Sequence, residues 1–343
     1  FAQDESAQHD GMPHSAIAAQ CVDFVLPPQR IAEEIARIAH HPYIGCSAPA
    51  TLGSATSVKE EPALNRILRQ LQRATEVDFA SYKPNTIQRR IARRMGLHRL
   101  ETMDDYAQLL DDRPEEATAL FQDILIGVTS FFRDPETFDA LRREVFPGLL
   151  TNRARGEPLR IWVTGCSTGE EAYSYAMAAA EFIEDAALSV PVQVFATDLN
   201  AASVDKACAG VYPKSIAQDV GETRLRRFFL EADGNYRITK AIRESVLFAR
   251  HNVLRDPPFS RVDIISCRNL LIYLGADLQK KLLNELHFAL KPAAYLVLGN
   301  SETIGSDRQL FEAQDTRHKI YRKLGGPGHL MAGAPTPGRA VRV

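Results

Sequence analysis

The chain has 343 residues, of which 45% are apolar and 24% are charged. Its 41 lysines and arginines nearly balance its 43 aspartates and glutamates, which leaves a formal net charge of −2. These values exclude a mainly disordered chain, a collagen-like repeat and a disulfide-rich miniprotein, the near-neutral charge argues against a dedicated nucleic-acid-binding protein, and the length predicts about two domains.

Neither a signal peptide nor a membrane span is visible. No run approaches the roughly 18 apolar residues that a transmembrane helix needs, and the chain starts at Phe1 without a basic segment followed by an apolar one. A start without Met suggests a piece of a longer protein. The five cysteines form no CxxC pair, so neither a zinc site nor a disulfide framework is expected. We therefore expect a cytoplasmic protein without a metal site and without direct membrane insertion.

Residues 1–43 end in a predicted amphipathic helix, because Ile31, Ile35 and Ile38 recur at helical spacing after Pro27 and Pro28. Two later segments of the chain have the composition of linkers. Residues 44–60 are rich in Gly, Ser, Ala, Pro and Thr, which is typical of a flexible linker, and residues 324–343 resemble a flexible tail.

Residues 61–150 are predicted to be helical. One helix carries an apolar stripe of Ile87, Ile91 and Met95, spaced four residues apart, and four arginines flank this stripe, namely Arg89, Arg90, Arg93 and Arg94. Like charges at this spacing repel by a few tenths of a kcal/mol per pair, so an opposite charge should compensate them. A solvated helix face is the usual explanation for such a run, but its density favours an acidic protein partner.

Residues 151–323 alternate strands and helices, which predicts an α/β domain with a doubly wound parallel sheet. The predicted strands are 159–164, 192–197, 262–266 and 294–298, and a long Ala-rich helix spans about 170–187. Residues 208–250 break this pattern. Short strands at 236–238 and 246–248 predict a small antiparallel β insertion there.

The first predicted strand runs into a Gly-flanked turn, 165–169, that opens a helix. Gly165 would let the backbone approach a ligand closely, and such turns bind ligands at the carboxyl edge of open α/β sheets. The turn matches neither GxGxxG nor a P-loop, and its Glu170 and Glu171 would repel phosphates. A cationic ligand without phosphate, such as S-adenosylmethionine, fits better. The alternative is a capping turn in which Ser167 or Thr168 begins the helix.

Polar residues also follow the next strands. Asp198 stands where a ribose diol is held in dinucleotide sites, or else caps the helix near Ala201. Arg268 and Asn269 follow a buried-looking strand, although Asn269 could equally cap a helix. Upstream, Phe131-Phe132-Arg133 suits either a core corner or a cofactor clamp, and taken alone it favours the core corner.

In this order, the motifs closely resemble the chemotaxis receptor methyltransferase (CheR) family over residues 61–323. The matching pieces are Phe131-Phe132-Arg133, Cys166 to Glu171, Ala196-Thr197-Asp198, and Cys267-Arg268-Asn269 with Leu271-Ile272-Tyr273. The resemblance implies a helical domain, a Rossmann-like methyltransferase domain with a β insertion, and S-adenosylmethionine as cofactor. It places these residues at the cofactor: Thr129, Arg133, Glu171, Asp198, Asn252, Val253, Arg268 and Asn269. It also places Arg133 and Tyr273 beside the reacting centre.

The same resemblance implies methylation of glutamate side chains on the signalling helices of chemoreceptors, with the arginine-rich helix facing the receptor. Gly127 departs from the family, which often has Asn there, so one cofactor hydrogen bond would be missing or replaced. The short turn at Asp233-Gly234-Asn235 predicts that methylation does not depend on a pentapeptide tether of the receptor.

Residues 1–43 resemble the end of a receptor methylesterase (CheB) domain, through Asp10-Gly11-Met12-Pro13 and Asp23-Phe24-Val25-Leu26-Pro27. A cut from a CheB–CheR fusion would explain both the missing Met and the linkers, and no hydrolytic activity is expected from this piece.

Two alternatives to a glutamate methyltransferase remain open. A non-catalytic S-adenosylmethionine-binding scaffold is disfavoured because Arg133 and Tyr273 are both present. An RNA methyltransferase is disfavoured by the net charge and the absence of an Asn/Asp-Pro-Pro-Tyr type motif at 266–269.

Overall fold

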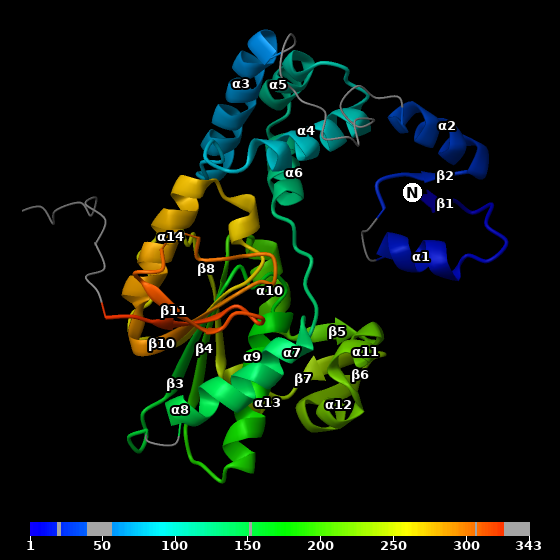
Figure 1. Cartoon of the computed structure of the whole chain (residues 1–343). Helices are drawn as coiled ribbons and strands as arrows, with labels where there is room; N and C mark the ends of the chain where they lie inside the picture. The colour runs from blue at the N-terminus through cyan, green and yellow to red at the C-terminus, as the bar shows by residue number, and fades with distance from the viewer. Residues whose placement is uncertain (19–21, 40–56, 151–152, 306, 326–343) are drawn as a thin grey trace, which may run out of the picture. The chain divides into compact units, whose positions relative to one another are not determined.

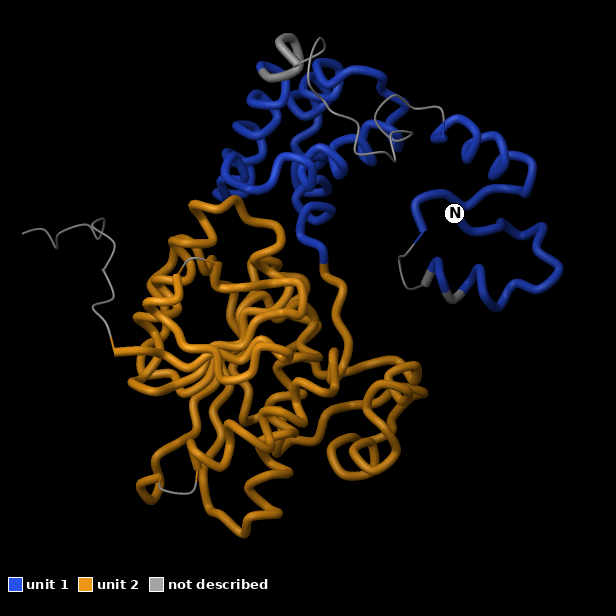
Figure 2. Tube along the Cα trace, in the orientation of Figure 1, with its two compact units in different colours: residues 1–126 blue, residues 127–343 orange. Residues whose placement is uncertain are grey.

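The computed structural model describes residues 1–18, 22–39, 57–150, 153–305 and 307–325. The chain forms two compact units, Phe1–Ile126 and Gly127–Val343, which Figure 2 colours separately. The helical part was expected to reach residue 150, but the division falls earlier. The reason is packing, because Phe131, Phe138 and Phe146 are buried in the core of the second unit.

The first unit contains four helices with a shared core, namely α3 (Ser57–Thr75), α4 (Pro84–His98), α5 (Met103–Asp112) and α6 (Pro114–Ile124). Helix α3 begins inside the segment expected to be a linker, and most of that segment lies outside the described residues. The predicted apolar stripe of α4 is confirmed, because Ile87, Ile91 and Met95 are all buried. Helix α5 is capped by Thr102, whose hydroxyl accepts a hydrogen bond from the amide of Asp105 at 3.1 Å.

The N-terminal segment of this unit is a small βαβα arrangement. Strands β1 (Ala2–Gln3) and β2 (Val25–Leu26) pair in parallel, and α1 (Gly11–Ala18) lies between them in the chain. Helix α2 (Pro28–Ala39) follows, and its start at Pro28 confirms the predicted helix. Figure 1 shows these four elements together.

The second unit is built on a seven-stranded sheet in the order β11-β12-β10-β9-β3-β4-β8. Its strands are β3 (Leu159–Thr164), β4 (Val192–Asp198), β8 (Val246–Arg250), β9 (Val262–Cys267), β10 (Leu290–Leu298), β11 (Phe311–Asp315) and β12 (Ile320–Lys323). Five of them run parallel, and β12 and β11 add an antiparallel edge. The expected doubly wound α/β fold is thereby confirmed.

Helices cover both faces of the sheet. As a consequence, every residue of the central strand β9 is buried. Apart from the helices of the β insertion and a short turn before α14, the described helices of this unit are α7 (Pro135–Ala140), η1 (Leu141–Val145), α8 (Phe146–Leu150), α9 (Glu170–Asp185), α10 (Ala201–Ala209) and α14 (Ala276–Ala289). Helix α9 packs on β3, β4 and β8, whereas α14 packs on β10. Trp162 of β3 is fully buried, and its indole N–H donates to the Thr197 hydroxyl at 3.0 Å.

The predicted β insertion is present but smaller than expected. It is a three-stranded antiparallel sheet in the order β5-β7-β6, and Figure 1 shows it beside α11 and α12, apart from the main sheet. Its elements are β5 (Val211–Pro213), η2 (Lys214–Ile216), α11 (Ala217–Val220), α12 (Glu222–Phe228), β6 (Phe229–Ala232), β7 (Asn235–Ile238) and α13 (Lys240–Glu244). The assignment of 246–248 to this insertion is wrong, because β8 pairs in parallel with β4 of the main sheet. The local sequence of this apolar strand is compatible with pairing in either sheet, and only the tertiary structure determines that it pairs with β4.

Candidate functional site

Four neighbouring strands end at one edge of the main sheet. Strands β8, β4, β3 and β9 are adjacent and parallel, so the residues that follow them meet at their carboxyl ends. The structure thereby brings together seven residues singled out from the sequence: Gly165, Glu171, Asp198, Asn252, Val253, Arg268 and Asn269. Their separation in sequence is spanned by the crossover connections of the sheet.

The backbone of the turn between β3 and α9 has a conformation that lets a ligand approach it closely. Gly165, Ser167 and Gly169 all have positive φ, at 64°, 49° and 95°. A Cβ on Gly169 would lie 2.8 Å from the Cβ of Ala207, so only glycine fits there. Helix α9 begins after Gly169 without a side-chain cap. The alternative in which Ser167 or Thr168 caps this helix is therefore wrong.

Asp198 closes this turn from the end of β4. Its Oδ2 accepts a hydrogen bond from the amide of Ser167 and its Oδ1 from the amide of Asn200, both at 2.8 Å. The helix cap is Asn200, which accepts from the amides of Ala202 and Ser203. Asp198 is therefore not the cap, and lone pairs remain on both carboxylate oxygens. Burial raises the pKa of Asp198, and the backbone hydrogen bonds oppose this shift.

Arg268 ties three segments together inside the protein. Its side chain is 0% exposed, and its Nη2 lies 2.5 Å from Oδ2 of Asp134 and donates to the carbonyl of Arg133 at 2.8 Å. Its Nη1 lies 3.3 Å from Oε2 of Glu171, whose Oε1 accepts from the Ser266 hydroxyl at 2.5 Å. Burial alone would lower the pKa of Arg268, but the charges of Glu171 and Asp134 raise it. Through these contacts, the buried Arg268 fixes the positions of Glu171 and of the backbone at Arg133 and Asp134.

The segment before α7 joins the same edge. The Ser167 hydroxyl donates to the carbonyl of Gly127 at 3.2 Å, and a Cβ on Gly127 would lie 3.1 Å from that hydroxyl oxygen. Thr129 is partly exposed. Arg133 is also partly exposed, and its Nη1 donates to the carbonyl of Val128 at 3.0 Å. The sequence departure at Gly127 therefore coincides with close packing against the first turn.

The residues after β8 and β9 differ in how well their polar atoms are satisfied. Asn252 accepts from the amide of Leu254 at 3.0 Å, whereas Oδ1 of Asn269 is buried and has no partner within the described residues. Asn269 also has a φ of 59°. It caps no helix, because the following turn η3 (Leu271–Tyr273) has no side-chain cap. Tyr273 is partly exposed at the end of that turn.

The sequence reading missed one buried carboxylate at this edge. Glu302 follows β10 and is 4% exposed. It accepts hydrogen bonds from the backbone amides of Asn269, Ile272 and Gly299 at 2.8, 3.2 and 2.7 Å. The signal was available, because a polar residue shortly after a buried strand is the pattern that singled out Asp198 and Asn269.

The arginines of α4 lie in the first unit and have unequal surroundings. Arg94 is paired with the buried Glu116, and Arg93 with Asp123 and, at 2.6 Å, with Asp23. Arg89 and Arg90 make no ion pair or side-chain hydrogen bond within the described residues. The compensation expected for this charge run is thus supplied partly by the chain itself.

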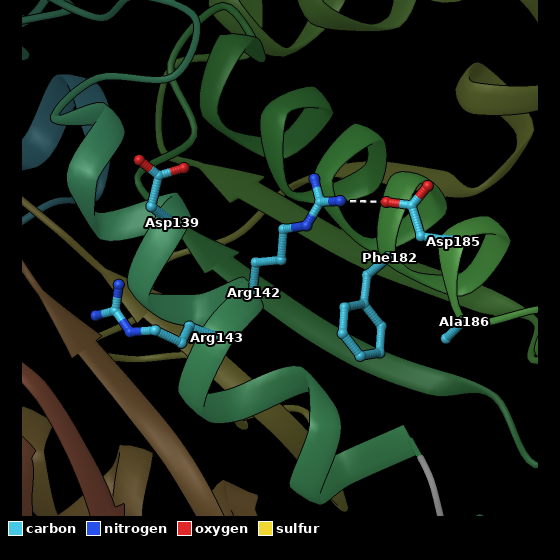
Figure 3. A pocket seen from close by; sticks show the side chains of 6 residues that line it. All are labelled: Asp139, Arg142, Arg143, Phe182, Asp185 and Ala186. Carbon is cyan, nitrogen blue, oxygen red and sulfur yellow. Dashed lines mark hydrogen bonds and ion pairs between the residues drawn. The ribbon is translucent and has the colours of Figure 1, made fainter.

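A hollow of about 440 Å³ lies away from these residues. Figure 3 shows its lining, which consists of Asp139, Arg142, Arg143, Phe182, Asp185 and Ala186. An ion pair between Arg142 and Asp185 crosses it. Helix α9 ends here at Asp185, whereas the candidate site lies at its first residue, Glu170. This hollow therefore has no part in the candidate site.

Within the described residues, no three His, Cys, Asp or Glu side chains are grouped so that they could hold a metal ion. None of the helices in the same residues is long and apolar enough to cross a membrane.

Comparisons with known proteins show the family to which the two units are similar. The family described as "CheR methyltransferase, SAM binding domain" matches residues 127–320, and "CheR methyltransferase, all-alpha domain" matches residues 62–125. A "chemotaxis protein methyltransferase" of Listeria monocytogenes is 32% identical over 69% of this chain and 88% of its own length. "Chemotaxis protein methyltransferase 1" of Pseudomonas aeruginosa is 30% identical over 69% and 88%. An "uncharacterized 104.1 kDa protein" of Rhodobacter capsulatus is 38% identical over 94% of this chain, which spans 36% of that relative.

The residues at the sheet edge fit S-adenosylmethionine. The two oxygens of Asp198 can accept from the hydroxyls of a ribose, and the unpartnered Oδ1 of Asn269 suits a cationic amino group. Glu171 lies in the first turn of α9, after β3, but its charge is already paired with Arg268. These residues follow three different strands, β4, β9 and β3, which explains why no single motif in the sequence was decisive.

Proposed function

Because the chain belongs to the CheR methyltransferase family, we propose that it transfers methyl groups from S-adenosylmethionine to glutamate side chains on the signalling helices of chemoreceptors, in the cytoplasm. The products are glutamate methyl esters and S-adenosylhomocysteine. The single observation that carries this proposal is the convergence of Asp198, Asn269 and the Gly165–Gly169 turn at one sheet edge. Relatives that are named chemotaxis methyltransferases support the substrate class.

The chemistry requires positioning more than acid–base catalysis. S-adenosylmethionine supplies an electrophilic methyl group on a positively charged sulfur. A glutamate carboxylate has an ordinary pKa near 4.3 and is already a nucleophile at pH 7, so no general base is needed. Correct positioning can contribute about 7–11 kcal/mol. We assign this role to Arg133, whose guanidinium would hold a carboxylate through charge-assisted hydrogen bonds, and to Tyr273, which would orient the substrate.

We assign receptor binding to the arginine-rich helix α4. Arg89 and Arg90 are the better candidates, since their charges are not neutralised by ion pairs among the described residues. Arg93 and Arg94 already pair with carboxylates of the chain, so we give them a supporting part in shaping this helix. A receptor helix rich in glutamate would provide the complementary charge.

We further propose that methylation does not need a receptor tether. The support is the tight connection between β6 and β7, where Asp233 and Gly234 have φ of 50° and 73°, as a two-residue hairpin turn requires. The test compares receptors with and without their C-terminal pentapeptide. Equal methylation rates are expected, and a large advantage for the tethered receptor would contradict the proposal.

The N-terminal piece receives a separate proposal. We infer that residues 1–43 are the end of a methylesterase-like (CheB) domain, joined through a linker to the methyltransferase. The parallel pairing of β1 and β2 around α1 supports this inference, because such a βαβ unit is typical of an α/β domain. This chain should not hydrolyse methylated receptors. Release of methanol from a methylated receptor by the chain alone would contradict that expectation.

The test of the proposed function is calorimetric titration with S-adenosylhomocysteine, repeated with Asp198→Ala. We expect binding by the natural chain and its loss in the variant. Transfer of radiolabelled methyl from S-adenosylmethionine to receptor and to RNA then identifies the substrate. Label on receptor glutamates supports the proposal, whereas label on RNA would refute it. Binding without any transfer would favour a non-catalytic scaffold.

A further inference from the structure

We propose that Glu302 is a positioning residue that presents Asn269 to the cofactor and Tyr273 to the reacting centre. The role rests on the proposed function, because it acts on residues of that site. Glu302 lies after β10, outside every motif that pointed to the site.

The contacts of Glu302 are confined to backbone amides. One oxygen accepts from the amides of Asn269 and Gly299 at 2.8 and 2.7 Å, and the other from the amide of Ile272 at 3.2 Å. Its side chain makes no ion pair with a cation in the described part of the chain. A 4% exposed carboxylate held in this way is satisfied only while those three amides converge on it.

The segment that Glu302 holds is supported at its far end by Gln279, which donates to the carbonyls of Leu271 and Leu274 at 2.8 and 3.1 Å, whereas its start lies at Asn269. Asn269 has a φ of 59°, a left-handed conformation that is uncommon for residues other than glycine. The Glu302 hydrogen bonds join the amide of Asn269 to that of Ile272, in the middle of the turn that ends at Tyr273. They stabilise the conformation of Asn269 and of this turn together. Asn269 thereby keeps a buried Oδ1 that has no hydrogen-bond partner within the described residues, an acceptor that a ligand donor would satisfy.

Gly299 completes this arrangement. A Cβ at this position would lie 2.8 Å from both Nδ2 of Asn269 and Oε2 of Glu302, and 2.9 Å from the backbone nitrogen of Asn269. The backbone of Asn269 and the carboxylate therefore meet where only a glycine leaves room. Replacing Gly299 would push Asn269 and the carboxylate of Glu302 apart without removing either, which gives a second way to disturb the same contact.

The experiment measures Glu302→Gln for S-adenosylhomocysteine affinity by calorimetry and for the KM values of both substrates. The amide turns one acceptor oxygen into a donor that faces a backbone N–H, so Asn269 should shift. We expect cofactor affinity to fall and the KM for S-adenosylmethionine to rise about tenfold, the effect of losing one hydrogen bond to a charged group. The KM for the receptor should rise as well, because the same turn carries Tyr273, which orients the substrate.

The control is Asp263→Asn. Asp263 is 2% exposed and also accepts from a backbone amide, that of Arg160, at 2.8 Å, but it stands at the opposite end of β9. Unlike Glu302 it also pairs with Arg153 and Lys291, at 2.6 and 2.9 Å. This variant should lose stability and keep normal cofactor affinity. If Glu302 only stabilised the fold, Glu302→Gln would behave like Asp263→Asn. It would lower the fraction of active protein without changing the KM of either substrate.

Two results would overturn the inference. One is a folded Glu302→Gln protein with natural cofactor affinity, and the other is an equal loss of affinity in Asp263→Asn. If Glu302→Gln does not fold, Gly299→Ala is measured against Gly148→Ala, whose Cβ meets only Tyr295 Oη at 4.0 Å. Affinity must then fall in the first variant alone. Failure of the natural chain to bind S-adenosylhomocysteine would instead refute the proposed function itself.

Discussion

Arg133 and Arg268 are two arginines of the candidate site with opposite surroundings. The side chain of Arg268 is 0% exposed and is held by two carboxylates and a carbonyl. The partly exposed Arg133 makes one hydrogen bond, to the carbonyl of Val128. Since a guanidinium has five N–H donors, Arg133 keeps donors for a ligand. Both Nη atoms of Arg268 are engaged by the fold, and its buried Nε has no partner within the described residues.

Replacing these two arginines should therefore have different consequences. Arg133→Ala should remove most methyl transfer and leave the free energy of unfolding nearly unchanged. Arg268→Ala should lower that free energy by about 3 kcal/mol, because it leaves Glu171 and Asp134 without their buried partner. Methylation rates and urea unfolding measure the two effects. Near-normal turnover of Arg133→Ala would remove its assigned role.

At the scale of elements, α4 is held to its neighbours by charge as well as by apolar packing. Glu116 of α6 is 4% exposed. It accepts hydrogen bonds from Arg94 at 2.7 Å and from the hydroxyl of Tyr106 at 2.8 Å. Burial alone would raise the pKa of Glu116, but these hydrogen bonds and the charge of Arg94 outweigh it and lower the pKa below 4.5. Three helices thus meet at one carboxylate.

Glu116→Gln should destabilise the first unit by about 3 kcal/mol, because Arg94 loses its charged partner in a largely buried position. The lowered pKa of Glu116 implies stability that is present above pH 4.5 and is lost as the pH falls through the folded-state value. Urea unfolding between pH 3 and pH 7 should show a shallower acid limb in the variant. The control is Asp111→Asn, which breaks an exposed pair with Arg66 and should cost about 1 kcal/mol or less. Equal losses in the two variants would contradict the prediction.

Arg89 and Arg90 of α4, which make no ion pair within the described residues, give a second prediction at this scale. Replacing both by glutamate should raise the KM for the receptor and leave the free energy of unfolding nearly unchanged, since neither side chain makes a hydrogen bond or ion pair in that part of the chain. Affinity for S-adenosylhomocysteine should remain natural. Receptor methylation at several salt concentrations measures the effect, which should shrink as salt screens the charges. An unchanged receptor KM would assign substrate binding to another surface.

At the scale of the whole molecule, the site exists only when the second unit is folded. Its residues come from the ends of β3, β4, β8 and β9, which span much of the chain. A ligand that binds the folded form alone stabilises it by mass action, by about 2.7 kcal/mol at a hundredfold excess over Kd. S-adenosylhomocysteine should therefore raise the unfolding temperature of the natural chain and not that of Asp198→Ala. An equal rise in both would place the ligand elsewhere.

Much of this arrangement could be predicted from local patterns. The strand, turn and helix at 159–185 and the polar residues after β4 and β9 follow from short-range periodicity and glycine placement. The apolar stripe of α4 follows in the same way. The motifs also indicated the family, because each consists of neighbouring residues in a specific order.

Other features could not be predicted, because they depend on which distant segments meet. The pairing of β8 with β4, the attachment of Phe131, Phe138 and Phe146 to the second unit, and the partners of Arg93 and Arg94 are choices among several similar local alternatives. Glu302 is the sharpest case. The sequence alone determined that a carboxylate follows β10, while only the tertiary structure decided that the three amides it binds come from two separate segments of the chain. The reason is physical: a buried carboxylate is stable wherever enough N–H donors converge, and convergence is a property of the folded chain.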